Sequence, residues 1–245
     1  MSSEMTYGIW SLRVDKSKPT LKALIDSPLY DAKGNITTPV VDNGNRNVNL
    51  QIKFEDQEKG ASHWSEATGW LVRPDLVVTA GHATFDHDYG RGKAVEVVAY
   101  VGHDGKKSIT DPSVHVRKGV QVITPKGWID GDTRRQRDVA FIKLDQPFTD
   151  ITPFLYAATP DGDHPPVGDI GYPGDRDSDQ TAAQMYDSWN GETYGLRIDS
   201  GGQHSVSSAP QISLGGIMKA MDGSGTAVET VEGIDYIHIR DPDSA

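Results

Sequence analysis

Two residues far apart in this chain, His82 and Asp138, have the types and surroundings that proton transfer requires. His82 closes the segment 69–82, in which two apolar runs flank a proline-containing turn and lead into small residues. This order predicts a buried strand that ends at the rim of the core and fixes one imidazole there. Because the unperturbed pKa of histidine lies near neutrality, such an imidazole can accept and return a proton under physiological conditions.

Asp138 is placed to act on that imidazole. It precedes the apolar run 139–144, so it lies where a charged loop enters the core. Burying an unpaired carboxylate costs on the order of several kcal/mol. The ring N–H of His82 would pair it, fix the tautomer of the imidazole and stabilise the imidazolium ion. Taken singly, each residue has a plainer interpretation: His82 ends a strand, and Asp138 bonds the backbone of its own loop.

Four short motifs extend this pattern along the chain. They are TAGHA at 79–83, DVAFIKL at 138–144, GYPGD at 171–175 and DSGGQ at 199–203. In this order they resemble the trypsin-like serine peptidases of the glutamyl endopeptidase type. That family usually shows TAGHC or TAAHC, then DxA(L/V)(I/L)xL, then GYPGD, and finally GGQSGSP or GNSGSP around its nucleophile.

The resemblance implies an all-β fold of two packed six-stranded antiparallel β-barrels with the catalytic cleft between them. It divides the chain into an N-terminal extension at 1–45, a first barrel at 46–150 and a second barrel at 151–245. The first barrel would carry His82 as general base and acid and Asp138 as its orienting residue. The implied reaction hydrolyses a peptide or protein substrate and needs no cofactor or metal ion.

Apolar patterning predicts strands for both barrels. Residues 1–45, by contrast, are polar and turn-rich. The strands expected for the first barrel are 48–54, 69–72, 76–80, 94–101, 114–124 and 139–144, and those for the second are 154–158, 167–171, 192–198, 212–218 and 234–239.

The nucleophile motif departs from the family pattern. Where the family places its serine directly after GGQ, this chain has His204 and then SVSSAP. Alignment on the proline makes Ser207 the nucleophile and residues 204–206 an insertion. Alignment on the glycines puts His204 at the nucleophile position, with Ser205 one step later. We take Ser207 as the expected nucleophile, and Ser205 remains the alternative.

The same insertion bears on the oxyanion site. In the family the donors are the N–H groups of the serine and of the glycine two positions before it, for which Gly202 is the candidate here. Gly202 is further from Ser207 than that, and losing one donor costs on the order of 2.7–4 kcal/mol. The alternative function is therefore a catalytically impaired pseudopeptidase that binds peptides or proteins. A mispredicted splice junction near His204 would also explain the insertion.

Two further residues bear on specificity. Glutamate-preferring members of the family have Gly-Ile-His near the end of the second barrel, whereas this chain has Met218 at the matching position. Ser200 matches the serine or threonine of the family's pocket wall. The resemblance therefore implies an apolar or permissive pocket lined by Met218, and the plainer interpretation of that side chain is a core filler.

Composition excludes several other classes of protein. The chain of 245 residues can bury a sizeable core, and with no cysteine it has no disulfide, metal thiolate or cysteine nucleophile. Its formal net charge of −11 argues against a nucleic-acid partner. No apolar run approaches the length of about 18 residues that predicts a membrane span, so no membrane partner is expected.

Two expectations remain. His82, Asp86 and His87 could form a metal site, but their spacing is not that of histidines on one helix face, and we expect no metal. The chain begins with methionine and without the pattern of an export signal, which predicts an intracellular location if it is complete. The family it resembles is mostly secreted, so a mature fragment is an equal alternative.

Overall fold

The fold is described from a computed structural model. It describes residues 4–15, 47–56, 64–102, 112, 114–132, 137–153, 170–171, 186–187, 214–222 and 227–240.

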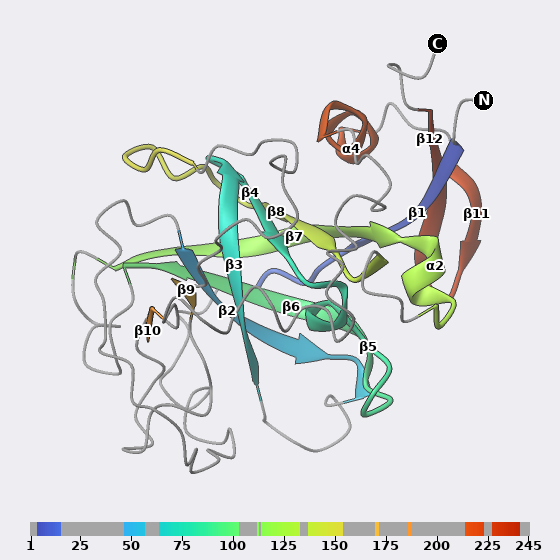
Figure 1. The fold of residues 1–245 in the computed structure, drawn as a ribbon, viewed down its shortest axis with the longest axis horizontal. Helices are drawn as coiled ribbons and strands as arrows, with labels where there is room; N and C mark the ends of the chain where they lie inside the picture. Colours follow the sequence, from blue (N-terminus) through green and yellow to red (C-terminus); the bar gives the residue numbers. More distant parts are fainter. Residues whose placement is uncertain are drawn as a thin grey trace, which may run out of the picture.

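Six antiparallel strands form a closed barrel at the centre of the molecule (Figure 1). They follow one another in the order β7-β8-β4-β3-β2-β6, and β6 pairs again with β7 to close the cylinder. Each of the six overlaps a strand expected for the first barrel, and β3 begins four residues earlier than expected. Their bounds are β2 Asn47–Phe54, β3 Ser65–Arg73, β4 Leu76–Thr79, β6 Gly92–Val101, β7 His115–Pro125 and β8 Ala140–Leu144.

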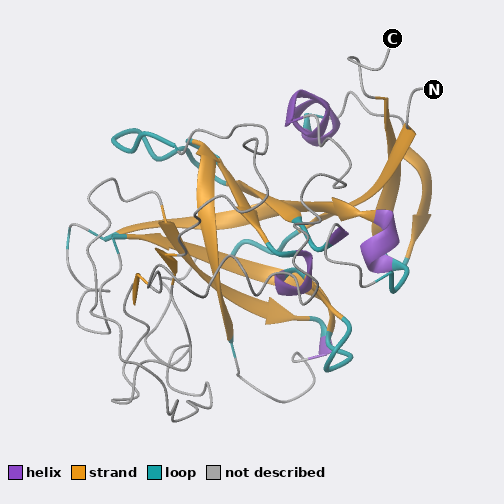
Figure 2. Ribbon diagram, in the orientation of Figure 1, coloured by secondary structure: helices purple, strands orange, loops and turns teal. Residues whose placement is uncertain are grey.

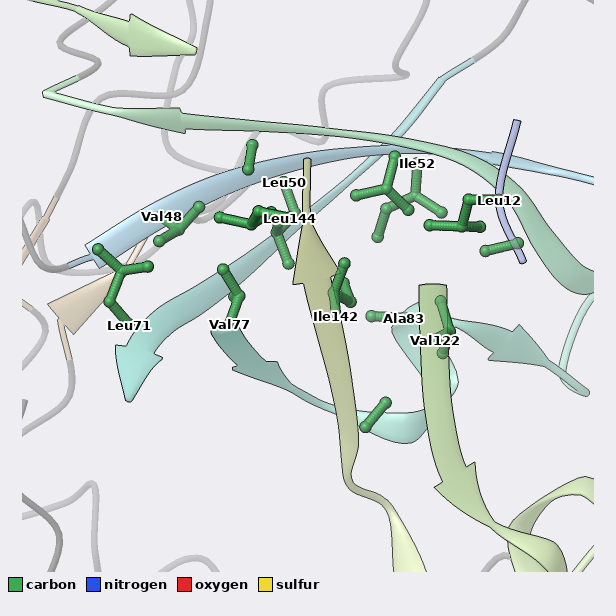
Figure 3. Packing of buried hydrophobic residues seen from close by; sticks show 14 of the residues in the cluster. Leu12, Val48, Leu50, Ile52, Leu71, Val77, Ala83, Val122, Ile142 and Leu144 are labelled. Carbon is green, nitrogen blue, oxygen red and sulfur yellow. The ribbon is translucent and has the colours of Figure 1, made fainter. Parts of the chain in front are cut away.

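The barrel is filled by apolar side chains from every strand. Figure 3 shows Leu50, Val77 and Ile142, from three different strands, directed into the same interior space, and all three are fully buried. We call this cluster the barrel core. A second cluster, the outer core, lies on the other side of β4 and contains Leu76 and Val78. Because the four residues of β4 are buried between two apolar layers, the strand is held firmly on both faces.

A three-stranded extension continues the sheet beyond β7, in the order β11-β12-β1-β7 (Figure 2). Its strands are β1 (Glu4–Ser11), β12 (Ile234–Arg240) and β11 (Ala227–Val231). Strand β1 was not expected, because residues 1–45 were predicted to be a turn-rich extension. Strand β12 was expected, but it pairs with β1 beside the first barrel.

Helix α4 (Leu214–Met221) corrects another expectation, because a strand was predicted at 212–218. Its buried side chains Ile217, Met218 and Ala220 belong to the outer core, beside residues of β1, β7 and β12. The intrinsic preference of two adjacent glycines against a helix is outweighed here by packing of one apolar face.

The second half of the chain is only partly described. Strands β9 (Ile170–Gly171) and β10 (Tyr186–Asp187) form a two-stranded antiparallel pair, and β9 falls within the strand expected at 167–171. The strands expected at 154–158 and 192–198 lie outside the described residues. Within these limits the nearly all-β architecture is confirmed. No helix among the described residues is long and apolar enough to span a membrane.

Replacing Gly69 by alanine should destabilise the barrel. A Cβ on this residue of β3 would lie 2.5 Å from Val77 Cγ1 and 2.9 Å from the carbonyl oxygen of Val78, so strands must shift. Overpacking of this kind costs about 1–3 kcal/mol. Urea unfolding measures the change in free energy.

The control is Val228→Ala on β11, because Val228 is 54% exposed and should change the free energy of unfolding by less than about 0.5 kcal/mol. Equal stability of Gly69→Ala and wild type would contradict the packing described here.

Candidate active site

A short 3₁₀ turn, Gly81–Ala83, presents His82 at the end of β4. The turn is closed by hydrogen bonds from the backbone N–H and the hydroxyl of Thr84 to the carbonyl of Gly81, at 2.9 and 3.0 Å. Gly81, Ala83 and Thr84 are buried, whereas the His82 side chain is 59% exposed. The backbone is therefore fixed while the imidazole remains accessible.

The pairing of β4 with β8 brings Asp138 to this turn. Thr79, the last residue of β4, pairs with Ala140, the first residue of β8. Since the strands are antiparallel, the residues just after β4 meet the residues just before β8. The sheet register thus accounts for the proximity of two residues that are distant in sequence.

Asp138 accepts two hydrogen bonds from His82. Its Oδ2 lies 2.8 Å from His82 Nδ1, and its Oδ1 lies 2.8 Å from the backbone nitrogen of His82. Because an ionised carboxylate only accepts, Nδ1 carries the proton. In the neutral ring Nε2 is then the basic nitrogen, and no hydrogen bond joins Nε2 to another residue in the described part of the chain.

Gly81 makes this close approach possible. A Cβ there would lie 3.2 Å from Asp138 Oδ1, 3.1 Å from the nitrogen of Val139 and 3.2 Å from Trp128 Cδ1. Those distances are tighter than most Cβ contacts, so the bare backbone of Gly81 lets a carboxylate and an indole pack on the turn together.

Contact between His82 and Asp138 shifts the pKa of each side chain so that its charged form is stabilised. The hydrogen bond to Asp138 raises the pKa of His82 above 6.5 against the opposing effect of burial, and the charges of Asp138, Asp88 and Asp86 add to it. Burial pushes the pKa of Asp138 upward, but the hydrogen bonds and charge of His82 outweigh it, so this pKa is lowered. The site therefore favours a protonated imidazole beside an ionised carboxylate.

The aromatic ring of Trp128 lies beside the imidazole of His82. The Trp128 ring lies 6.5 Å from the His82 ring and 5.6 Å from that of His87, between centroids. The His87 ring in turn lies 4.9 Å from the ring of Phe85. Sequence patterning did not single out Trp128, since nothing in its local sequence indicates contact with His82.

The remaining predicted site residues are not joined to this pair by the described structure. Ser207, its alternative Ser205, Gly202 and Ser200 lie outside the described residues. Met218 is 7% exposed and packs in the outer core from α4, not from the strand expected there. Its predicted role in the specificity pocket stays a prediction.

The side chains of the alternative metal site have separate partners. His82 bonds Asp138, Asp86 forms an ion pair with Arg91 at 2.5 Å, and His87 Nε2 lies 2.6 Å from the carbonyl oxygen of Trp128. Among the described residues no group of three histidine or acidic side chains is arranged to hold a metal ion.

A family model for trypsin matches residues 41–188, which include the six strands of the barrel and both His82 and Asp138. The chain belongs to the trypsin family of serine peptidases. The match ends before Ser200 and Ser207, so it does not include the expected nucleophile. Peptides or proteins are the substrates expected of a trypsin-family hydrolase.

Solved structures similar to this trypsin-family chain include a Glu endopeptidase in complex with MPD and a collagenase. The first is 17% identical with a TM-score of 0.45, covering 85% of this chain and 93% of the other. The second, described as HL collagenase, is 19% identical with a TM-score of 0.42, covering 62% of this chain and 60% of the other. No curated protein matches the sequence.

Asp138→Asn should lower the pKa of His82. The substitution removes the negative charge that raises this pKa and replaces one of the two carboxylate acceptor oxygens by an NH2 donor, whereas the burial that lowers the pKa remains. NMR titration of the imidazole resonances measures the change. His238, which bonds Thr6 instead of Asp138, serves as the internal reference. An unchanged His82 titration in Asp138→Asn would show that the pair is not formed in solution.

Proposed function

We propose that this protein is a serine endopeptidase that hydrolyses peptide bonds through an acyl-enzyme. His82 acts as general base and acid, Asp138 orients it and Ser207 is the nucleophile. The observation that carries the proposal is the doubly bonded His82–Asp138 contact, which fixes the proton on Nδ1 and leaves Nε2 of an exposed ring basic.

The proposed reaction has two halves. His82 Nε2 takes the proton of the Ser207 hydroxyl as Oγ attacks the peptide carbonyl carbon. The imidazolium ion then protonates the leaving amine, and the C–N bond breaks to leave an ester on Ser207. A water molecule gives a proton to His82 and attacks this ester, and Ser207 regains its proton as the acid product leaves.

Asp138 supports both halves from one position. Its bond to Nδ1 holds the ring, and its negative charge stabilises the imidazolium ion that forms twice in the cycle. Its second bond, to the backbone N–H of His82, fixes the carboxylate itself. An acceptor fixed at two points loses little orientation freedom when the ring becomes charged.

The roles of the remaining residues follow from the proposed domain division. Residues 46–150 form the barrel with His82 and Asp138, 1–45 precede it, and 151–245 supply the nucleophile. In this proposal the backbone N–H of Gly202 stabilises the oxyanion, and Ser200 and Met218 contribute to the specificity pocket.

A fluorophosphonate probe tests the nucleophile. We expect it to label Ser207, and we expect His82→Ala to abolish labelling because the hydroxyl then lacks its base. His238→Ala, at another exposed histidine, is the matched control and should label normally. Mass spectrometry of the digested protein identifies the modified residue.

The outcomes separate the alternatives. Labelling of Ser205 would preserve the mechanism and overturn the assignment of Ser207. Absence of labelling in folded wild-type protein would overturn the peptidase proposal, and peptide binding by the same protein would then favour the pseudopeptidase.

The pH dependence of peptide hydrolysis provides a second test. The general base must be neutral, and the pKa of His82 is raised, so kcat/KM should increase with pH through a midpoint above 6.5. Asp138→Asn should move this acidic limb to lower pH and reduce kcat on the order of 10⁴-fold. An acidic limb that stays in place in Asp138→Asn would contradict the assignment of His82 as the base.

A further inference from the structure

Trp128 connects the two chain segments that carry the His82–Asp138 pair. It lies in the short helix α2 (Lys126–Ile129), upstream of Asp138, and is 5% exposed. Its indole Nε1–H donates to the carbonyl oxygen of Phe85 at 2.9 Å. Its own carbonyl oxygen lies 2.6 Å from His87 Nε2, which must carry a proton because a carbonyl only accepts. Trp128 is thus tied twice to the segment that follows His82.

The indole also packs on the residue that precedes His82. Its Cδ1 is one of three atoms that a Cβ on Gly81 would meet within 3.2 Å, and Asp138 Oδ1 is another. The indole and the carboxylate therefore pack side by side against the same face of Gly81. The His82 ring stands 6.5 Å from the indole ring at an interplanar angle of 57°.

Helix α2 is itself held against the sheet extension. Lys126 Nζ lies 4.7 Å from the centre of the Tyr236 ring on β12 and 2.7 Å from Asp130 Oδ2. Ile129 packs on Gly8 of β1, where a Cβ would collide with its side chain. The helix that carries the indole is therefore also held by contacts with β1 and β12, in addition to the hydrogen bonds to Phe85 and His87.

We propose that Trp128 is a positioning residue that packs against the Gly81–Ala83 turn beside Asp138 and so keeps both His82 hydrogen bonds at their working length. This inference rests on the proposed function for its catalytic consequence. The positioning itself concerns only described residues and can be measured without turnover. Tryptophan suits this positioning role because its side chain is large and rigid. Here its ring nitrogen and its backbone carbonyl are both hydrogen-bonded.

The test compares Trp128→Phe and Trp128→Leu with wild type. Trp128→Phe keeps an aromatic ring that shields His82 but loses the bond to Phe85, so we expect the pKa of His82 to fall toward 6.5 as the contact with Asp138 loosens. For Trp128→Leu, which removes the indole, we expect kcat per labelled active site to fall about 10-fold to 100-fold with KM little changed. NMR titration and active-site titration with the fluorophosphonate give the two readouts.

Trp10→Phe is the matched control. Trp10 is also buried, donates its indole N–H to the carbonyl of Ala94 at 2.8 Å, and has its ring contact with Phe85 at 6.4 Å. We expect this variant to lower the urea midpoint while the pKa of His82 and kcat per labelled site stay at wild-type values. A merely structural role for Trp128 predicts the same result for the Trp128 variants.

The two proposals fail in different ways. A Trp128→Phe protein that folds and keeps the wild-type pKa of His82 would overturn the positioning role, whatever its activity. If wild type is not labelled by the fluorophosphonate, the peptidase proposal fails, and the pKa comparison still decides the role of Trp128. If Trp128→Leu does not fold, Trp128→Phe carries both readouts.

Discussion

The pairing of β4 with β8 is the constraint on which the site depends. Thr79 opposite Ala140 sets the register, and the antiparallel direction then leaves only the turn after β4 and the loop before β8 to face each other. A slip of one residue would turn every side chain of these strands to the opposite face. Because β4 is buried between the barrel core and the outer core, such a slip would exchange the side chains that fill the two clusters and disrupt the packing of both. The packing of apolar side chains on β4 and β8 thus fixes the position of His82 relative to Asp138.

A fixed backbone turn that presents one accessible imidazole is well suited to proton transfer. The turn is closed by the hydrogen bonds of Thr84, Asp138 and Trp128 pack against its residue Gly81, and Ala83 is buried. Only the imidazole extends outward. The electrostatics follow from this arrangement, since a carboxylate held by two donors stays ionised in spite of its burial and keeps the ring ready to take a second proton. The trypsin family membership and this local chemistry both support the proposed hydrolysis of peptide bonds.

Sequence patterning predicted the barrel well because each of its strands carries a local apolar signal, and the segments before His82 and after Asp138 are among the clearest. Strand β1 was missed because Glu4–Ser11 mixes polar and apolar residues and becomes a strand through its pairing with β7 and β12. Helix α4 differs from the strand predicted at 212–218 because Gly215 and Gly216 disfavour a helix locally, and the packing in the outer core that outweighs this preference is a tertiary effect. The contact of Trp128 with the turn joins segments distant in sequence, and no local pattern reports such a contact.

The position of the proton on His82 tests the central claim most directly. Nitrogen-15 NMR of labelled protein, at a pH above the pKa of His82, distinguishes the two neutral tautomers of the ring. The account predicts a protonated Nδ1, held by Asp138, and an unprotonated Nε2 that is free to act as a base. A ring with its proton on Nε2 would contradict the account, because Asp138 would then accept nothing from the imidazole and the serine hydroxyl would have no base.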